Sequence, residues 1–294
     1  VGRYLIYLIY IFFIPMVYEY KEYAMRIYKK VCTFAALLLV IQFVALNTIG
    51  YAVPGVIRFL PLTDENLYDY SYAVFYTNSR RCMSLFGEPS HYAMYVLPCL
   101  AFCLLRNKRV RNKDLCLAGI ISLTIVMSST FTGIFAMIFV WGFWIVQNVA
   151  KKYISLKLSL IVTFSVIAFF FLLLNTKLGN YLLNGEIYKS QSTGRFEGYT
   201  YLMNLDMSNT QILLGHGMDD IGSNGIYLAG WARLVYYYGI IGATLYTICL
   251  WNCTMKNKMG RTILLLLFVI MIGSEANFMP MFVTYMLMVI VFSQ

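Results

Sequence analysis

The sequence predicts an all-α fold, a polytopic integral membrane helical bundle of about nine transmembrane helices with two long extracytoplasmic loops. Sixty per cent of the 294 residues are apolar and only 12% are charged, a balance typical of proteins whose main solvent is lipid. Several apolar runs approach the length of about 20 residues that a helix needs to cross the hydrocarbon core. None of these runs has the alternating pattern of a membrane β-barrel.

Each apolar run predicts one helix, and charged or polar stretches separate most of the runs. The expected helices are 4–18, 31–50, 91–105, 115–131, 133–149, 158–175, 227–252, 262–275 and 277–293. The chain begins at Val1, inside an apolar run and without a basic leader region. We therefore expect residues 1–294 to form a single transmembrane domain, the C-terminal part of a longer chain.

Along the chain, short connections rich in basic residues alternate with connections that contain few of them for their length. Three to five Lys or Arg lie in each of the short connections 19–30, 106–114, 150–157 and 253–261. The long loops, 51–90 and 176–226, contain three Lys or Arg each. Ten of the 13 acidic residues lie on the side of these long loops or at its edge. The positive-inside rule places the short connections in the cytoplasm and both long loops outside. The net charge of +10 is thus a topology signal, and we expect no nucleic-acid partner.

The seven cysteines predict no disulfide framework, because six of them fall within or at the ends of predicted helices. Only Cys82 lies in a long outer loop. The pairs Cys99/Cys103 and Cys249/Cys253 are each four residues apart on a helix, which fits either soft-metal ligands or small packing residues. We favour packing and expect no metal site.

The first long loop ends in charged residues that run directly into a predicted helix. Arg80, Arg81, Glu88 and His91 arrive together at the outer interface, and Pro89 is typical of a helix start. The two arginines fit either a binding site or an anchor to lipid phosphates. Glu88 favours function, because an anchor does not require a carboxylate at the membrane boundary.

The second long loop contains a candidate anion-binding turn. Ser192 or Thr193 is a candidate N-cap for a short helix whose first turn carries Arg195. Free backbone N–H groups, the positive end of a helix dipole and a guanidinium together suit a phosphate or pyrophosphate. The aromatic and apolar stretch from Tyr199 to Leu205 predicts a helix that lies on the membrane.

Further ionisable residues stand in unusual surroundings. His216 lies between two glycines and shortly before Asp219 and Asp220, which fits either a tight turn or proton transfer. Arg233 lies inside a predicted helix, and Glu275 lies in the outer turn between the last two helices. Because intramembrane charges face a cavity or a partner more often than lipid, these two form either a structural pair or part of a site.

Five segments of the chain occur in the order and at the intervals of a known superfamily. They are Arg81-x-x-Ser-Leu-Phe-Gly-Glu88-Pro89, Ser129-x-x-Thr132-Gly133, Gly194-Arg195, Leu214-Gly215-His216-Gly217 and Tyr238-Gly239-Ile240-Ile241-Gly242. Over residues 75–292 the chain resembles the bacterial O-antigen polymerase and ligase superfamily, which builds O-antigen, capsule and exopolysaccharide chains. The ligase branch has a His-Asn pair after the Gly-His-Gly segment, where this chain has Ser223-Asn224. The resemblance therefore favours a polysaccharide polymerase.

The resemblance implies a glycosyltransferase-C-like fold and a reaction on lipid-linked sugars. Such an enzyme transfers a glycan from undecaprenyl pyrophosphate to an acceptor hydroxyl at the outer face of the bacterial cytoplasmic membrane. The resemblance implies no nucleotide sugar, no metal and no other cofactor. The expected partners are the undecaprenyl-pyrophosphate-linked oligosaccharide, membrane lipids and a chain-length regulator.

This reaction assigns a role to each candidate residue. Breaking the anomeric C–O bond develops negative charge on pyrophosphate, which fixed guanidinium groups stabilise. The candidates for this clamp are Arg81 and Arg195, then Arg233, with Arg80 as the substitute for Arg81. The attacking hydroxyl needs a proton acceptor, for which Glu88 stands slightly ahead of His216.

Two alternative functions are carried beside the polymerase. One is an O-antigen ligase, and the other, of a different class, is a flippase or transporter of lipid-linked sugars. A transporter is expected to show internal repeats, or helices broken near the midplane with paired polar residues. The sequence shows no such repeat and its charges gather at the outer edge, which favours the enzyme.

Overall fold

The computed structural model describes most of the helices and parts of both long loops. The described residues are 19–55, 81–106, 110–150, 197–204, 209–217, 227–254, 258–276 and 282–292. Their regular structure is helical, without a strand among them, as the sequence predicts. The chain divides into two compact units, Val1–Met137 with Pro280–Gln294, and Ile138–Met279. The predicted helices 4–18 and 158–175 lie outside the described residues.

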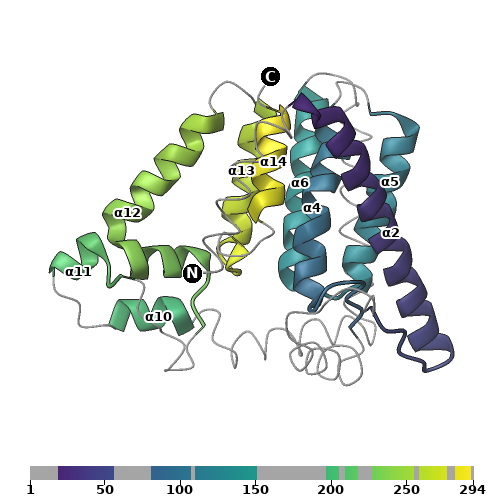
Figure 1. The fold of residues 1–294 in the computed structure, drawn as a ribbon, viewed down its shortest axis with the longest axis horizontal. Helices are drawn as coiled ribbons and strands as arrows, with labels where there is room; N and C mark the ends of the chain where they lie inside the picture. The colour runs from purple at the N-terminus through teal and green to yellow at the C-terminus, as the bar shows by residue number, and fades with distance from the viewer. Residues whose placement is uncertain are drawn as a thin grey trace. The chain divides into compact units, whose positions relative to one another are not determined.

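The first unit is a helical bundle around α4. Its elements are α2 (Lys21–Thr48), α4 (Pro89–Leu105), α5 (Asn112–Met127), the first turns of α6 (Phe131–Ala150) and α14 (Phe282–Phe292). The helix α4 packs against α2, α5 and α14, so most of its residues are buried (Figure 1). Long-range hydrogen bonds hold it there: the Tyr92 hydroxyl bonds to Thr124 of α5, and the Tyr285 hydroxyl of α14 donates to the Met94 carbonyl.

The second unit is arranged around a broken helix, α12. Its described helices also include the rest of α6, α10 (Glu197–Asn204), α11 (Asn209–Leu214) and α13 (Lys258–Ile270). The helix α12 (Gly230–Thr254) packs against α10, α11 and α13 (Figure 1). The helical path is interrupted at Gly239, whose φ of 65° and ψ of −175° are not helical. The continuous helix predicted over 227–252 is therefore wrong at its middle, because glycine there adopts a conformation that breaks the hydrogen-bond ladder.

Three of the described helices are long and apolar enough to cross a membrane. They are Lys21–Thr48, Phe131–Val149 and Gly230–Asn252, and the last contains the break at Gly239. The apolar helices Pro89–Leu105 and Met259–Ile270 are shorter. These helices identify a membrane protein, while the expected total of about nine includes segments outside the described residues.

The helix α2 begins at Lys21, ten residues before the predicted start of the run 31–50. The connection predicted over 19–30 is therefore mostly helical, which corrects the sequence reading. Its Lys, Glu, Met and Arg residues favour helix, and its charges have partners on other helices. The Glu22 carboxylate lies 2.5 Å from an Arg106 guanidinium nitrogen. The apolar pattern does not predict these charged first turns of α2, because charged residues within a helix look like the end of an apolar run.

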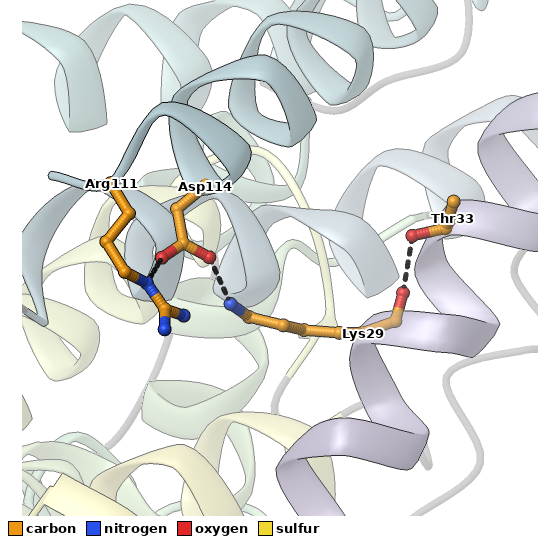
Figure 2. A network of polar contacts seen from close by, with 4 residues as sticks. All are labelled: Lys29, Thr33, Arg111 and Asp114. Atoms are coloured by element: carbon orange, nitrogen blue, oxygen red, sulfur yellow. Dashed lines mark hydrogen bonds and ion pairs between the residues drawn. The ribbon is translucent and has the colours of Figure 1, made fainter.

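A charged network ties α2 to α5 at one end of the first unit (Figure 2). The Asp114 carboxylate receives the Lys29 ammonium at 2.5 Å on one oxygen and Arg111 Nε at 2.9 Å on the other. Thr33 donates its hydroxyl hydrogen bond to the Lys29 carbonyl at 2.7 Å. Basic residues of two predicted cytoplasmic connections thus gather at the same end of these helices.

Asp114→Asn is expected to lower the thermal stability of the purified protein in detergent at pH 7 by about 2 kcal/mol, because two charge-assisted hydrogen bonds are weakened. Burial raises the pKa of the Asp114 carboxyl, but the bonds from Lys29 and Arg111 outweigh burial and hold the pKa below its ordinary 3.8. The ionised carboxylate therefore stabilises the fold above pH 3.8, and this contribution is lost as pH falls toward the folded-state pKa. Melting curves across this acid range check both effects.

Arg111→Ala is the matched control, because the Arg111 side chain is 69% exposed and its pair with Asp114 contributes less. The expected loss of stability is under half that of Asp114→Asn. An Asp114→Asn variant that melts like the wild type at pH 7 would show that the network does not hold α2 to α5.

Candidate functional site

Arg81 lies in the segment 81–88 that leads into α4. One guanidinium nitrogen donates to the Ser129 carbonyl at 3.0 Å, and the residue is only 6% exposed. Ser129 belongs to the turn between α5 and α6, 48 positions further along the chain. The structure therefore brings together two of the five segments that carried the superfamily resemblance.

The turn between α5 and α6 is built from buried hydroxyl residues. Ser128, Ser129 and Thr130 are each buried, and Ser129 has a φ of 54°, which is unusual for a residue other than glycine. A Cβ added at Gly133 would lie 2.6 Å from the Cβ of Ala93, so glycine lets the start of α6 pack closely on α4. Arg81 holds the same turn through its hydrogen bond to the Ser129 carbonyl.

Glu88 is the N-cap residue of α4, and Pro89 occupies the first helical turn, as predicted. The Glu88 side chain makes no capping hydrogen bond to the helix backbone, and it is 39% exposed. Its carboxylate accepts a hydrogen bond from the Ser90 hydroxyl at 3.0 Å, and His91 Nε2 lies 3.8 Å away. An accessible carboxylate that does not cap its own helix is suited to exchange a proton.

His216 lies on the break in α12. The backbone N–H groups of His216 and Gly217 donate to the Tyr236 and Tyr237 carbonyls at 2.8 and 3.1 Å. In an unbroken helix those carbonyls would bond to residues 240 and 241, so the Gly-His-Gly segment replaces helical hydrogen bonds lost at Gly239. The imidazole ring stacks on Tyr236 at 4.6 Å between centroids. The glycines on either side of His216 have φ of 84° and 80°, and this segment positions the imidazole against Tyr236.

Two glycines make this contact possible. A Cβ at Gly215 would lie 2.5 Å from the Tyr237 carbonyl carbon and 2.6 Å from the Gly239 nitrogen. A Cβ at Gly239 would in turn overlap the Leu213 carbonyl and lie 2.6 Å from the Gly215 nitrogen. The Leu-Gly-His-Gly and Tyr-Gly-Ile-Ile-Gly segments are thus two halves of one backbone contact.

Arg233 forms an ion pair with Glu275 within the second unit. Both side chains are mostly buried, and Glu275 lies in the segment that follows α13. This segment also accepts a hydrogen bond from the Gly230 N–H at the Ser274 carbonyl, 2.9 Å away. The structural pair, one of the two predicted interpretations, is therefore present.

Several predicted residues lie outside the described residues. They are Arg80, Ser192, Thr193, Arg195, Asp219 and Asp220. The helix predicted from Tyr199 is present as α10, and its aromatic side chains Tyr199 and Tyr201 pack against the buried cluster of Leu228, Ala232 and Tyr236.

Three cysteines of α2 and α4 occupy buried positions, whereas Cys116 of α5 is exposed. Cys32, Cys99 and Cys103 are buried in α2 and α4, which fits packing residues. No group of three or more His, Cys, Asp or Glu suited to a metal occurs among the residues that the structure describes. Cys82 of the outer loop is fully buried, so a reagent in the outer medium is not expected to reach it in the folded protein.

The sequence did not predict that Gln42 and Ser84 hold residues 81–88 against α2. Gln42, fully buried in α2, accepts a hydrogen bond from the Ser84 N–H at 2.7 Å and donates to the Ser84 carbonyl at 3.1 Å. Ser84 has a φ of 56° and donates its hydroxyl to the Ala35 carbonyl at 2.6 Å. The available signal was an amide side chain inside an apolar membrane run, which is costly without a partner.

The apolar helices and the polar cluster at one end of α4 define a helical membrane protein. A family model described as WcaD colanic acid polymerase matches residues 2–186, and the chain belongs to this family. The match includes α2, α4, α5, α6 and the residues around Arg81 and Glu88. No curated protein and no solved structure matches the chain.

Family membership confirms the predicted resemblance to polysaccharide polymerases. It supports a role in polysaccharide biosynthesis, polymerisation of the glycosyltransferase type and a lipid-linked oligosaccharide substrate. The break in α12 is a feature that the sequence reading had expected of a transporter. The family nevertheless favours the polymerase over the transporter.

Proposed function

We propose that the protein is a polysaccharide polymerase that works on undecaprenyl-pyrophosphate-linked glycans at the outer face of the bacterial cytoplasmic membrane. It would transfer the glycan of one lipid carrier onto a lipid-linked repeat unit. The supporting observation is the Arg81–Ser129 contact, which brings together two segments of the superfamily pattern, the first of which ends at Glu88 and Pro89 at the start of α4. The family match independently supports a polymerase.

The position of this cluster agrees with the predicted topology. Glu88 precedes the first turn of α4 and Arg106 follows its last, so about 27 Å of helix separates them. Arg106 pairs with Glu22 near the basic end, where the positive-inside rule expects the cytoplasm. Arg81 and Glu88 therefore belong to the end predicted to face outward.

The proposed reaction forms one bond, breaks one bond and transfers one proton. The acceptor hydroxyl oxygen bonds to the anomeric carbon, and the bond between that carbon and the pyrophosphate oxygen breaks. Glu88 takes the hydroxyl proton, and the pyrophosphate leaves on its lipid carrier. A guanidinium at Arg81 stabilises the charge that develops on the leaving group. Glu88 is preferred to His216 as the base, because its exposed carboxylate lies at the same end of the unit as Arg81.

The other basic residues of the proposed clamp are Arg195 and Arg233, with Arg80 as the substitute for Arg81. The charge of Arg233 is balanced by Glu275, so Arg195 is the stronger candidate of the two.

Deleting the gene and sizing the surface polysaccharide on a gel tests the function. We expect loss of the long ladder with single-repeat material retained. Loss of all surface attachment, with polymer still made, would indicate a ligase. Absence of lipid-linked repeats outside the membrane would indicate a flippase.

Complementation of the deleted strain with Glu88→Gln is expected to leave the ladder absent or reduced by about 100-fold, because the amide cannot accept the proton. Glu22→Gln is the matched control: it replaces an exposed carboxylate at the other end of the unit, and a wild-type ladder is expected. Equal loss in both variants, or a normal ladder with Glu88→Gln, would remove Glu88 from the mechanism.

A further inference from the structure

A single buried amide holds both ends of the described part of the first loop. Gln42 Nε2 donates to the carbonyls of Val53, at 3.2 Å, and Ser84, at 3.1 Å. Its Oε1 accepts from the Ser84 N–H at 2.7 Å. Gly55 is buried beside this contact, where an added Cβ would lie 3.3 Å from Gln42 Nε2 and overlap the Ser84 carbonyl. The chain thus leaves α2 and returns before α4 at the same point on α2.

The contact with Gln42 lies several residues before the C-terminal end of α2. The helix rises about 1.5 Å per residue, so the stretch from Lys29 to Thr48 extends about 29 Å, close to the thickness of the hydrocarbon core. Lys29 belongs to the charged network at the basic end. Measured along the helix, Gln42 lies about 9 Å and Ala35 about 20 Å from Thr48. Because Ser84 bonds to both residues, the segment reaches toward the middle of the apolar part of α2.

Non-helical backbone at this depth needs internal partners. Polar backbone groups in hydrocarbon are tolerated only where protein satisfies their hydrogen bonds. Gln42 supplies two of those bonds to Ser84, and Arg81, Cys82, Met83 and Ser84 are all buried. An amide in the apolar span of α2 is itself costly unless it has such partners. The two costs are offset by the same contact.

We propose that residues 81–88 form a re-entrant segment, held in the outer half of the membrane by Gln42, which positions Arg81 and Glu88 below the lipid headgroup plane. The ligand of this site is a diphosphate carried on a membrane lipid, which approaches from within the bilayer. This identification of the ligand rests on the proposed function, whereas the re-entrant geometry does not. Gln42 acts through the segment and is a positioning residue.

Chemical labelling of Cys82 tests the geometry directly, because Cys82 lies next to Arg81 and is fully buried. The background carries alanine at Cys116, Cys249 and Cys253, and a membrane-impermeant maleimide is added to intact cells. We expect little labelling of Cys82 in the otherwise wild-type protein. Gln42→Met, similar in volume but without the amide, should raise labelling at least about fivefold by leaving the Ser84 backbone groups unpaired.

Ser84→Pro tests the same contact from the loop, because proline has no N–H and cannot adopt a positive φ. We expect it to release Cys82 as Gln42→Met does. Ser84→Gly is the matched control: it removes the hydroxyl bond to Ala35 but keeps both backbone groups bonded to Gln42 and suits the φ of 56°, so Cys82 should stay protected. Leu39→Ala opens a cavity one turn from Gln42 without removing a hydrogen bond, and Cys82 should again stay protected.

Size-exclusion profiles of fluorescent fusions check that each variant is folded. Labelling after denaturation measures the total amount of Cys82, to which the labelling in intact cells is compared. Three results would contradict the re-entrant segment. They are strong labelling of Cys82 in the wild type, no increase of labelling in Gln42→Met, and an equal increase of labelling in Leu39→Ala. A released segment with a normal polysaccharide ladder would overturn the positioning role of Gln42. A normal ladder in Arg81→Ala, with the labelling pattern as expected, would instead overturn the proposed clamp and leave the re-entrant geometry standing.

Discussion

Replacing Arg81 with alanine is expected to reduce long-chain polysaccharide by at least about 100-fold, because the proposed reaction would lose a fixed positive charge that stabilises the proposed pyrophosphate leaving group. Arg81→Lys should also be strongly impaired, since an ammonium cannot reproduce the planar, multiply donating guanidinium. The measurement is the surface polysaccharide ladder of the deleted strain complemented with each variant, at matched protein levels.

Two controls separate catalysis from packing in this experiment. Ser129→Gly keeps the carbonyl that accepts the Arg81 hydrogen bond and suits the φ of 54°, so the turn should survive with its stability unchanged or raised. Arg106→Ala removes a guanidinium at the basic end and should leave the ladder intact. If Arg81→Ala melts several degrees lower in detergent yet still produces a full ladder, Arg81 is a structural bridge to the turn and not part of the clamp.

Gly239→Ala is expected to be the most damaging substitution in the second unit. The φ of 65° with ψ of −175° lies in a region essentially restricted to glycine and costs alanine about 1–3 kcal/mol, and the added Cβ would overlap the backbone of Leu213 and Gly215. Relieving that overlap must separate α11 from α12 and remove the bonds from His216 and Gly217. We expect a total loss of about 3 kcal/mol or more, with loss of the ladder. Thermal melting of the purified protein measures the first effect, and the complementation assay measures the second.

The glycines of this chain supply graded controls for that result. Gly217→Ala carries a φ of 80° but meets no described atom within 4 Å, so only the conformational cost of about 1 kcal/mol is expected. Gly119→Ala, in α5, has neither a positive φ nor a described neighbour within 4 Å, so no loss is expected and a gain of about 0.5–1 kcal/mol from helix propensity is allowed for. Equal effects in Gly239→Ala and Gly217→Ala would mean that the close approach of α11 and α12 contributes nothing.

The ends of the helices show why local patterns predicted some features and missed others. Pro89 marked the start of α4 correctly, because its fixed φ and missing N–H suit the first turn whatever surrounds it. The early start of α2 was missed, because the ion pairs of Glu22 with Arg106 and of Lys29 with Asp114, which give these charges partners, lie in distant parts of the chain. Those contacts join residues about 85 positions apart, and no local window contains them.

The candidate site divides in the same way. Arg81 and Glu88 were selected from the sequence, because charges at the edge of an apolar run are costly without a purpose. Their contacts were not predicted: the Ser129 carbonyl binds Arg81, and the Gln42 amide binds the backbone of Ser84 in the same segment, each from another part of the chain. The Gly-His-Gly segment was interpreted as a turn or a proton carrier, while its backbone bonds to α12 were hidden by the apparent continuity of that helix.

Composition, apolar runs and charge alternation were enough to determine an all-helical membrane protein, because solvent preference is a local property of each run of residues. The ordered segments around Arg81, Glu88, His216 and Gly239 were enough to indicate the polymerase family. The break in α12, the ion pair of Arg233 with Glu275 and the burial of the Arg81 segment against α2 were decided only by tertiary structure. Each depends on a buried backbone or charged group finding its partner in a distant segment, and that partner exists only once the chain has folded.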